Sequence, residues 1–149
     1  MMRELKIRPA SREDLPRLMG LLLELHNRSA EEALPPEASR AWEQILGSAG
    51  RTVLVAEDDD ALVGSADLLV VANLTHDATP WAIVENVVVV RERRRQGIGR
   101  ALMVEAVARA KAAGCYKVQL LSRLDRVEAH DFYVALGFER LAEGFRLYF

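Results

Sequence analysis

The stretch with the clearest chemical signature runs from Glu85 to Leu102 and reads E-N-V-V-V-V-R-E-R-R-R-Q-G-I-G-R-A-L. It passes from a β-branched apolar run through a cluster of arginines and two glycines into an alanine-rich helical pattern. Backbone N–H groups in the first turn of a helix lack an intrahelical partner, and the helix dipole adds partial positive charge there. Glycine has no side chain that would keep an anion from the backbone. The stretch therefore predicts a strand, a loop and a helix start that hold a phosphate or diphosphate.

The spacing of the glycines excludes two common phosphate-binding loops. A P-loop needs a lysine directly after its last glycine, and neither Gly97 nor Gly99 is followed by lysine. A dinucleotide-binding fingerprint needs glycine or alanine where this chain has Leu102. The spacing that remains is Arg94-x-x-Gly97-x-Gly99. A solvated charged turn is the alternative interpretation of the arginines, but the adjoining glycines and helix start favour anion binding.

Composition is typical of one globular domain spanning residues 1–149, with half of the residues hydrophobic. The formal net charge of −2 gives no overall basic field that would favour nucleic acid as a partner. No apolar run reaches the roughly 18 residues of a membrane helix, and the first residues lack the apolar core of a signal peptide. The single cysteine, Cys115, cannot form an intramolecular disulfide. We therefore expect a cytoplasmic protein that does not use a membrane.

Hydrophobic periodicity and turn residues predict strands and helices along the whole chain. Strands are expected at 5–8, 52–57, 61–72, 81–90, 116–121, 138–141 and 145–149, and helices at 11–27, 37–47, 97–113 and 126–136. The run 81–90 is apolar on both faces, which indicates a central strand. This order predicts an α+β (α/β three-layer) fold, in which a mixed central sheet of six to seven strands carries helices on both faces.

Three separated motifs, in the same order, resemble the GNAT acetyltransferase superfamily. The Arg94-x-x-Gly97-x-Gly99 loop and the strand before it resemble the family's acyl-CoA-binding motif. The run 129–138, A-x-x-F-Y-x-x-x-G-F, matches a second segment, and V-E-N-V-V-V at 84–89 matches the central strand. The run G-C-Y-K-V at 114–118 further resembles the glucosamine-6-phosphate N-acetyltransferase branch. The resemblance covers nearly the whole chain and implies a GNAT fold with acetyl-CoA as co-substrate.

The resemblance also implies where the cofactor lies. In the family, the fourth and fifth strands spread apart and free main-chain N–H groups for the pantetheine amides and the thioester carbonyl. We expect cofactor contacts from the central strand and the loop after it, namely Val87, Val88, Val89, Arg94, Arg95, Gln96, Gly97, Ile98, Gly99 and Arg100. One position departs from the family: many members have a cofactor-contacting asparagine where this chain has Arg126. Arg126 and Arg123 are instead candidates for contact with a phosphate of the cofactor or the acceptor, with a solvated loop arginine as the alternative interpretation.

Two residues are candidates for the proton transfers. Glu85 interrupts an otherwise apolar strand, where an ionised carboxylate is costly unless it is paired or opens onto a cleft. In many relatives a glutamate at this position takes the ammonium proton, often through water; a structural ion pair is the alternative here. Tyr133 is the candidate general acid, because a phenol with a pKa near 10 is protonated at neutral pH and can protonate a thiolate. Packing against the sheet is its alternative role.

The acceptor implied by the resemblance is a primary amine of a small molecule, acetylated by direct transfer in a ternary complex. An amino-sugar phosphate is one candidate, because of the G-C-Y-K-V run. Possible acceptor contacts are Thr75, His76 and Asp77, which precede the central strand, and Arg123. The histidines share no metal-ligand spacing, so no metal site is expected.

Two other functions remain possible at this level. The chain could acetylate a protein lysine or N-terminal amine, which an extended acceptor groove would favour. It could instead be a non-catalytic acyl-CoA-binding regulator, although pure binding requires neither Glu85 nor Tyr133. A homodimer through the apolar strand expected at 145–149 is a further possibility, because a bare hydrophobic edge invites pairing.

Overall fold

The structure is a computed structural model, and it describes residues 4–26 and 34–149. The chain divides into two compact units, Met1–Gln119 and Leu120–Phe149. The first unit holds a mixed β-sheet with its helices, and the second holds one helix, α5 (Val127–Ala135), with irregular backbone around it. Among the described residues, no helix is both long and apolar enough to cross a membrane.

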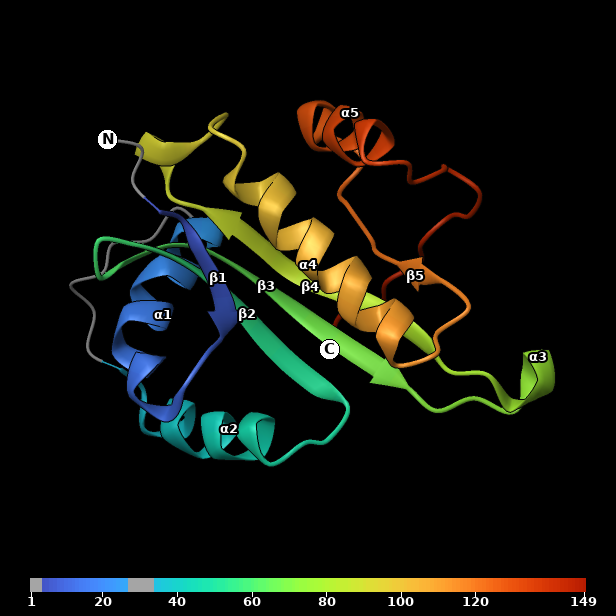
Figure 1. The fold of residues 1–149 in the computed structure, drawn as a ribbon, viewed down its shortest axis with the longest axis horizontal. Helices are drawn as coiled ribbons and strands as arrows, with labels where there is room; N and C mark the ends of the chain where they lie inside the picture. The colour runs from blue at the N-terminus through green and yellow to red at the C-terminus, as the bar shows by residue number, and fades with distance from the viewer. Residues whose placement is uncertain (1–3, 27–33) are drawn as a thin grey trace. The chain divides into compact units, whose positions relative to one another are not determined.

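Within residues 4–26 and 34–149, the sheet has five strands in the order β1-β2-β3-β4-β5 (Figure 1). The first four pair antiparallel with their neighbours and the fifth pairs parallel with the fourth: β1 (Lys6–Pro9), β2 (Arg51–Asp58), β3 (Ala61–Val71), β4 (Trp81–Val89) and β5 (Val118–Gln119). A mixed sheet in an α+β fold is therefore confirmed. The prediction of six to seven strands is wrong.

The missing strands belong to the hairpin predicted at 138–141 and 145–149, where the structure has irregular backbone. Alternating apolar residues favour a strand only when one face of that strand is buried. Phe145 and Leu147 are instead 87% and 80% exposed. The strand predicted at 116–121 likewise shortens to the two residues of β5. Without a strand at 145–149, the argument for a dimer through that edge no longer holds.

Helices lie on both faces of the sheet in the first unit. Two successive residues of β3 show this. A Cβ on Gly64 would lie 3.1 Å from Ile98 Cγ2 of α4, whereas Ser65 lines a pocket together with Leu18 of α1 and Trp42 of α2. Successive residues of a strand point to opposite faces. One face is therefore covered by α4 (Ile98–Ala112), and the other by α1 (Leu15–Leu23) and α2 (Pro36–Leu46).

Local sequence signals explain most of the helix ends. Ser11 and Asp14 form a capping box, in which the Ser11 backbone N–H donates to Asp14 Oδ2 at 2.7 Å. The first helix is divided into a 3₁₀ turn (Arg12–Asp14), α1 and a second 3₁₀ turn (Glu24–His26). Its predicted end at Asn27 lies outside the described residues. Gly114 and Gly137 stop α4 and α5 as predicted, with φ of +81° and +96°.

A network of buried charge ties β1 to the start of α1 and to the β2–β3 hairpin. Asp14, whose side chain is 1% exposed, accepts hydrogen bonds from Arg8 Nη1 at 2.7 Å and Arg17 Nη2 at 2.7 Å. Arg8 Nε also donates to Glu57 Oε2 at 2.6 Å. The hydrogen bond from Arg8 lowers the pKa of Asp14 far below its usual range, and the same pair raises the pKa of Arg8.

The Asp14→Asn variant should be less stable than the wild type by about 2 kcal/mol at pH 7, because Arg8 and Arg17 lose charge-assisted hydrogen bonds to a buried carboxylate. A lowered carboxyl pKa stabilises the folded state fully above the unfolded pKa of about 3.9, and this stabilisation is lost as the pH falls through the folded value. Urea unfolding at a series of pH values should therefore show the two proteins converging in strong acid.

The control for this prediction is Glu43→Gln, which breaks the exposed ion pair between Arg12 Nη2 and Glu43 Oε2 (2.8 Å). That loss should be no more than about 1 kcal/mol at any pH. A difference between Asp14→Asn and the wild type that stays constant down to pH 2 would contradict the assignment of the charge network.

Candidate functional site

The central strand β4 carries a β-bulge in its middle. Between the register pairs Ser65–Val88 and Asp67–Glu85, β3 advances by two residues while β4 advances by three. Asn86 lies within this bulge and has a φ of +52°, in the left-handed region that asparagine adopts more readily than most residues. The bulge bends β4 and separates Glu85, on its N-terminal side, from the valines that follow.

Beyond its first residues, β4 is open along one edge. β5 pairs only with Ala82 and Ile83, and no other strand among the described residues pairs with that edge. The Val90 N–H donates to Val63 O on β3 at 2.9 Å, so by the alternation of a strand the Val89 N–H points to the open edge. A ligand lying along this edge can therefore bond to the backbone of β4.

The three valines that follow the bulge differ in what they present. The side chain of Val88 is buried in the core cluster between the sheet and α1, and by the same alternation its N–H faces β3. Val87 and Val89 are half-buried, and their N–H groups face the other way. The backbone of Val87 and Val89 is thus better placed for a ligand than that of Val88.

The loop after β4 turns directly into the start of α4. Arg95 and Gly97 have φ of +61° and +83°, and Gly97 is the N-cap residue. A Cβ on Gly97 would meet no atom within 4 Å, so the space in front of this position is open. The first intrahelical bond runs from Ala101 N to Gly97 O at 3.0 Å. Because glycine cannot cap a helix with a side chain, the N–H groups of 98–100 are available to an anion.

The arginines around this helix start divide into two groups. Arg93 supports the loop: its Nη1 lies 2.5 Å from Oδ2 of Asp58, whose side chain is 2% exposed, and its Nε donates to Gln96 Oε1 at 2.9 Å. Arg94 Nε donates to Val89 O at 3.0 Å. Arg95 and Arg100 are exposed and lie next to the open helix start. Sequence analysis missed Asp58, since an acidic residue in a polar turn looks solvated.

Glu85 lies on the face of the sheet that carries α1 and α2. It is half-buried and stands opposite Asp67 of β3, and opposite residues of an antiparallel pair share one face. Among the described residues it forms no ion pair, which argues against the structural alternative. Asp67 instead holds Arg51, whose Nε donates to Asp67 Oδ1 at 3.0 Å. That bond raises the pKa of Arg51.

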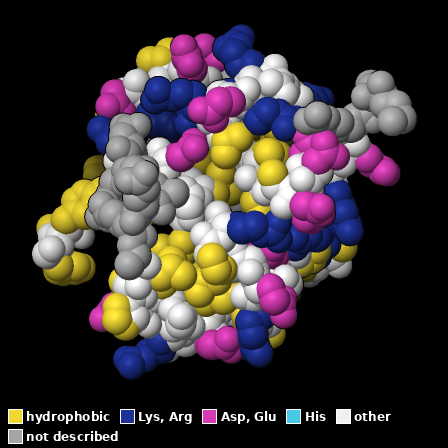
Figure 2. Space-filling view, turned by 90° about the vertical axis from the view of Figure 1, so that its left-hand side faces the viewer, with side chains coloured by type: hydrophobic (Ala, Val, Ile, Leu, Met, Phe, Trp, Pro, Cys, Tyr) yellow, Lys and Arg dark blue, Asp and Glu magenta, His cyan; other side chains and the backbone are white. Residues whose placement is uncertain are grey.

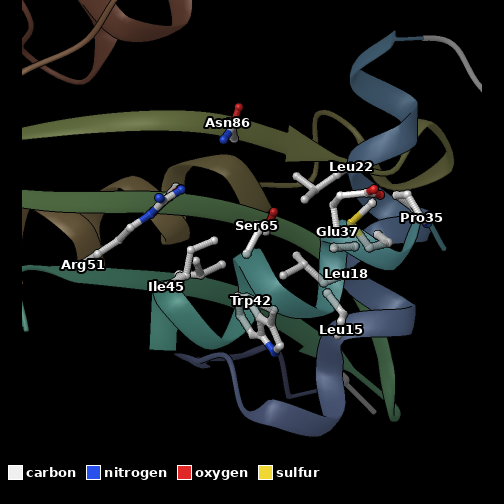
Figure 3. Close-up of a pocket in the computed structure, with 15 residues that line it drawn as sticks. Leu15, Leu18, Leu22, Pro35, Glu37, Trp42, Ile45, Arg51, Ser65 and Asn86 are labelled. Atoms are coloured by element: carbon white, nitrogen blue, oxygen red, sulfur yellow. The ribbon is translucent and has the colours of Figure 1, made fainter. Parts of the chain in front are cut away.

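A pocket of about 370 Å³ opens on the same face, between the two helices and the sheet (Figure 3). Hydrophobic side chains from α1 and α2, such as Leu18 and Trp42, form its walls, while Arg51, Ser65 and Asn86 reach it from β2, β3 and β4. From the side of the molecule seen in Figure 2, a hydrophobic patch is visible among charged side chains. The polar residues of this pocket lie far apart in the sequence, and sequence analysis found none of them.

The three residues before β4 that were predicted to contact the acceptor lie outside this pocket. Thr75, His76 and Asp77 belong to α3 (Thr75–Ala78), a short turn in which His76 and Asp77 have left-handed φ values of +53° and +58°. Asn73 Nδ2 donates to Thr75 O at 2.9 Å, and the His76 ring stacks on Tyr116 with centroids 4.0 Å apart. None of the three lines the pocket.

The second unit holds the remaining predicted residues. Tyr133 lies on α5, half-buried, with its ring edge-on to Phe132 and Phe138 at centroid distances of 5.1 and 6.0 Å. Arg123 Nη2 lies 3.0 Å from Asp125 Oδ2, and both side chains are exposed. Arg126 is the N-cap residue of α5, where its carbonyl accepts from the His130 N–H at 3.1 Å.

Neither unit offers a metal site: the described residues contain no group of three or more His, Cys, Asp and Glu side chains that could hold a metal ion. The only ionisable sulfur is that of Cys115, a free thiol whose pKa is raised by burial. A raised pKa disfavours the nucleophilic thiolate.

The chain thus has a bulged central strand that leads into a helix with glycine at its N-cap. Residues 19–138 match the model of the Acetyltransferase (GNAT) family. The chain is 33% identical to glucosamine 6-phosphate N-acetyltransferase 1 of Oryza sativa subsp. japonica, over 97% of this chain and 87% of the relative. It therefore belongs to the GNAT family and is an acetyltransferase.

Solved structures show the same fold. A protein of Bacillus halodurans C-125, described as a transcriptional regulator, superposes with a TM-score of 0.91 at 31% identity, over 98% of this chain and all of that one. An aminoglycoside N-acetyltransferase solved in complex with CoA gives a TM-score of 0.80 at 20% identity, over 100% of this chain and 95% of its own. At that identity the second likeness concerns the fold alone.

The Gly97→Val variant should bind CoA at least roughly tenfold more weakly, a loss of about 1.4 kcal/mol, because a branched side chain fills the open space in front of the helix start. Valine at a positive φ also strains the backbone, by about 1–3 kcal/mol. Titration calorimetry measures the affinity, and thermal unfolding measures the strain.

Gly114→Val is the matched control for strain. Gly114 has nearly the same φ, +81°, and equally open surroundings, but it lies at the other end of α4. Both variants should lose similar stability, and only Gly97→Val should lose affinity. Equal CoA affinities in the two folded variants would contradict the anion site.

Proposed function

We propose that this chain is an acetyl-CoA-dependent N-acetyltransferase that moves an acetyl group to a primary amine of a small molecule by direct transfer in a ternary complex. The observation that carries the proposal is a row of backbone N–H groups that runs from the unpaired edge of β4 to the start of α4, where Gly97 is the N-cap residue. Glu85 lies at the N-terminal side of this row, next to the bulge at Asn86. We further infer a cytoplasmic enzyme, in keeping with its single free cysteine.

The chain's own groups fit CoA in two stretches. Backbone N–H groups of Val87 and Val89 would bind the pantetheine arm and polarise the thioester carbonyl, as preorganised donors do at a developing oxyanion. The N–H groups of 98–100, with Arg95 and Arg100, would bind the diphosphate. Arg94 and Gln96 would act mainly by fixing the loop, since both are engaged within it. Bound acetyl-CoA supplies an activated acetyl group and a thiolate leaving group.

Glu85 is proposed as the general base. An amine at neutral pH is mostly protonated and must lose a proton before it can attack a carbonyl. A half-buried carboxylate without an ion-pair partner among the described residues can accept that proton, directly or through one water molecule. Its position supports this role, because only the bulge residue Asn86 lies between Glu85 and the proposed backbone donor Val87. The base is therefore close to the place where the thioester carbonyl would bind.

Tyr133 is proposed as the general acid that protonates the departing thiolate. A phenol holds its proton at neutral pH and gives it up to a thiolate only at small cost, since a thiol has a pKa of about 8.5. The edge-on rings of Phe132 and Phe138 fix the orientation of the Tyr133 ring within its unit. The proposal for Tyr133 rests on the A-x-x-F-Y-x-x-x-G-F segment together with this orientation.

A small-molecule acceptor is supported over a protein acceptor by the pocket beside Asn86. The pocket is bounded by two helices and the sheet, and at about 370 Å³ it falls in the range of small-ligand sites. A protein acceptor would favour an extended groove instead. A purely regulatory acyl-CoA-binding module would have no use for a carboxylate placed beside this pocket.

Two variants that preserve side-chain shape test the chemistry. Glu85→Gln should lower kcat/KM for the amine and remove or displace the acidic limb of its pH profile, because the acidic limb reports the base. Tyr133→Phe should lower kcat by roughly 10²–10⁴ with much less change in KM, because the lost interaction belongs to the transition state. A thiol-release assay gives both results, and titration calorimetry should show CoA affinity nearly unchanged in both variants.

Wild-type rate and pH profile in Glu85→Gln would reduce Glu85 to a structural residue. Near-normal kcat in Tyr133→Phe, or a defect confined to KM, would make Tyr133 a packing or binding residue. An acyl donor with a more acidic thiol should recover rate in Tyr133→Phe more than in the wild type, because an activated thiolate leaves without a proton.

A further inference from the structure

We infer that the acceptor is a primary amine attached to an apolar, unphosphorylated group, of the arylalkylamine or alkylamine kind, and not an amino-sugar phosphate. The inference rests on the proposed function, because it names the acceptor of the same site. It comes from the pocket beside the β4 bulge, whose walls are hydrophobic and whose charges favour a cation.

The walls of the pocket suit an apolar group. Leu22 of α1 and Trp42 and Ile45 of α2 reach it in Figure 3. Its lining also includes Met19 of α1 and Val53 of β2. Aliphatic and aromatic side chains bind hydrocarbon but leave hydroxyl groups without partners. A sugar ring with its several hydroxyls would therefore lose hydrogen bonds to water on entering, whereas an aryl or alkyl group would lose none.

The charges of the pocket disfavour a phosphate. Arg51 is the only cationic residue of its described lining, and the guanidinium already donates through Nε and Nη2 to Asp67, whose side chain is 5% exposed. A phosphate is bound best by guanidinium or ammonium groups whose positive charge is not already balanced by a neighbouring carboxylate. With Glu37 and Asp67 against Arg51, the ionisable groups of the lining sum to one negative charge, which attracts an ammonium group.

The pocket also leads to the proposed chemistry. Asn86, which lines it, follows Glu85 directly in the chain, and Glu85 stands opposite Asp67, another lining residue. Figure 3 shows Asn86 and Arg51 reaching the pocket from the strands, while Leu18, Leu22, Trp42 and Ile45 come from the helices. An amine bound with its apolar group between α1 and α2 can therefore direct its nitrogen toward the bulge and the base.

The first test compares acceptors with the wild-type enzyme and acetyl-CoA. The acceptors are phenethylamine, glucosamine 6-phosphate and a lysine-containing peptide, and each reaction is followed by thiol release. We expect kcat/KM for phenethylamine to exceed that for the other two at least tenfold. Equal or better use of glucosamine 6-phosphate or of the peptide would overturn the inference and leave the proposed function standing. Thiol release that no amine of any class accelerates would overturn both.

The second test fills the pocket. Ala41→Trp adds a large side chain at a lining position of α2, whereas Ser39→Trp adds the same side chain to the same helix outside the lining. Ala41→Trp should raise the Michaelis constant for phenethylamine at least tenfold, and Ser39→Trp should not. CoA affinity, measured by calorimetry, should be unchanged in both.

A third variant covers the case in which Ala41→Trp does not fold. Glu37→Gln keeps the shape of a lining side chain and removes its charge. It should raise the Michaelis constant for phenethylamine and reduce the dependence of that constant on salt concentration. An unchanged Michaelis constant in Glu37→Gln, or in a folded Ala41→Trp protein, would show that the amine binds outside this pocket.

Discussion

The peptide groups of β4 impose the constraint on which the rest of the site depends. A strand in a sheet satisfies its N–H and C=O groups on both edges, and an edge without a partner must use water, side chains or a ligand. In this chain β5 supplies a partner for only two residues of β4, and the bulge at Asn86 interrupts the register with β3. The donors that remain lie in a row that ends at the start of α4, where the N-cap residue Gly97 has no side chain. The proposed binding of an extended ligand, with amides at one end and a diphosphate at the other, uses that arrangement.

Buried carboxylates hold the elements around this row in place. Asp14 joins β1 to α1, Asp58 joins the β2–β3 hairpin to the arginine loop, and Asp67 joins β3 to β2 through Arg51. Each has an arginine partner, because a buried charge without one is very costly. Among the clustered arginines of the loop, Arg93 supports the structure through Asp58, whereas Arg95 and Arg100 are exposed and are proposed to bind the diphosphate.

The sequence predicts the local features of this molecule well. The β4–loop–α4 unit could be predicted because its strand, glycines and helix are consecutive in the sequence. The helix ends at Gly114 and Gly137 could be predicted because glycine readily adopts the positive φ that stops a helix. The terminal hairpin could not, since the alternation around Phe145 indicates a strand only if a core lies beneath it. The pair Arg51–Asp67 and the pocket around Trp42 depend on segments brought together by the fold. No local sequence pattern predicts that these segments meet. The structure therefore adds most to the inference about the acceptor.

Amide chemical shifts of the ¹⁵N-labelled protein during a titration with CoA test the central claim most directly, because they report each backbone donor separately. The account predicts that the amides of Val87 and Val89 and those of residues 98–100 show the largest changes. It also predicts that Val88, whose N–H faces β3, and the strands β1 and β2 change little. Saturable shifts confined to other parts of the chain, with the β4 edge and the start of α4 unaffected, would contradict it.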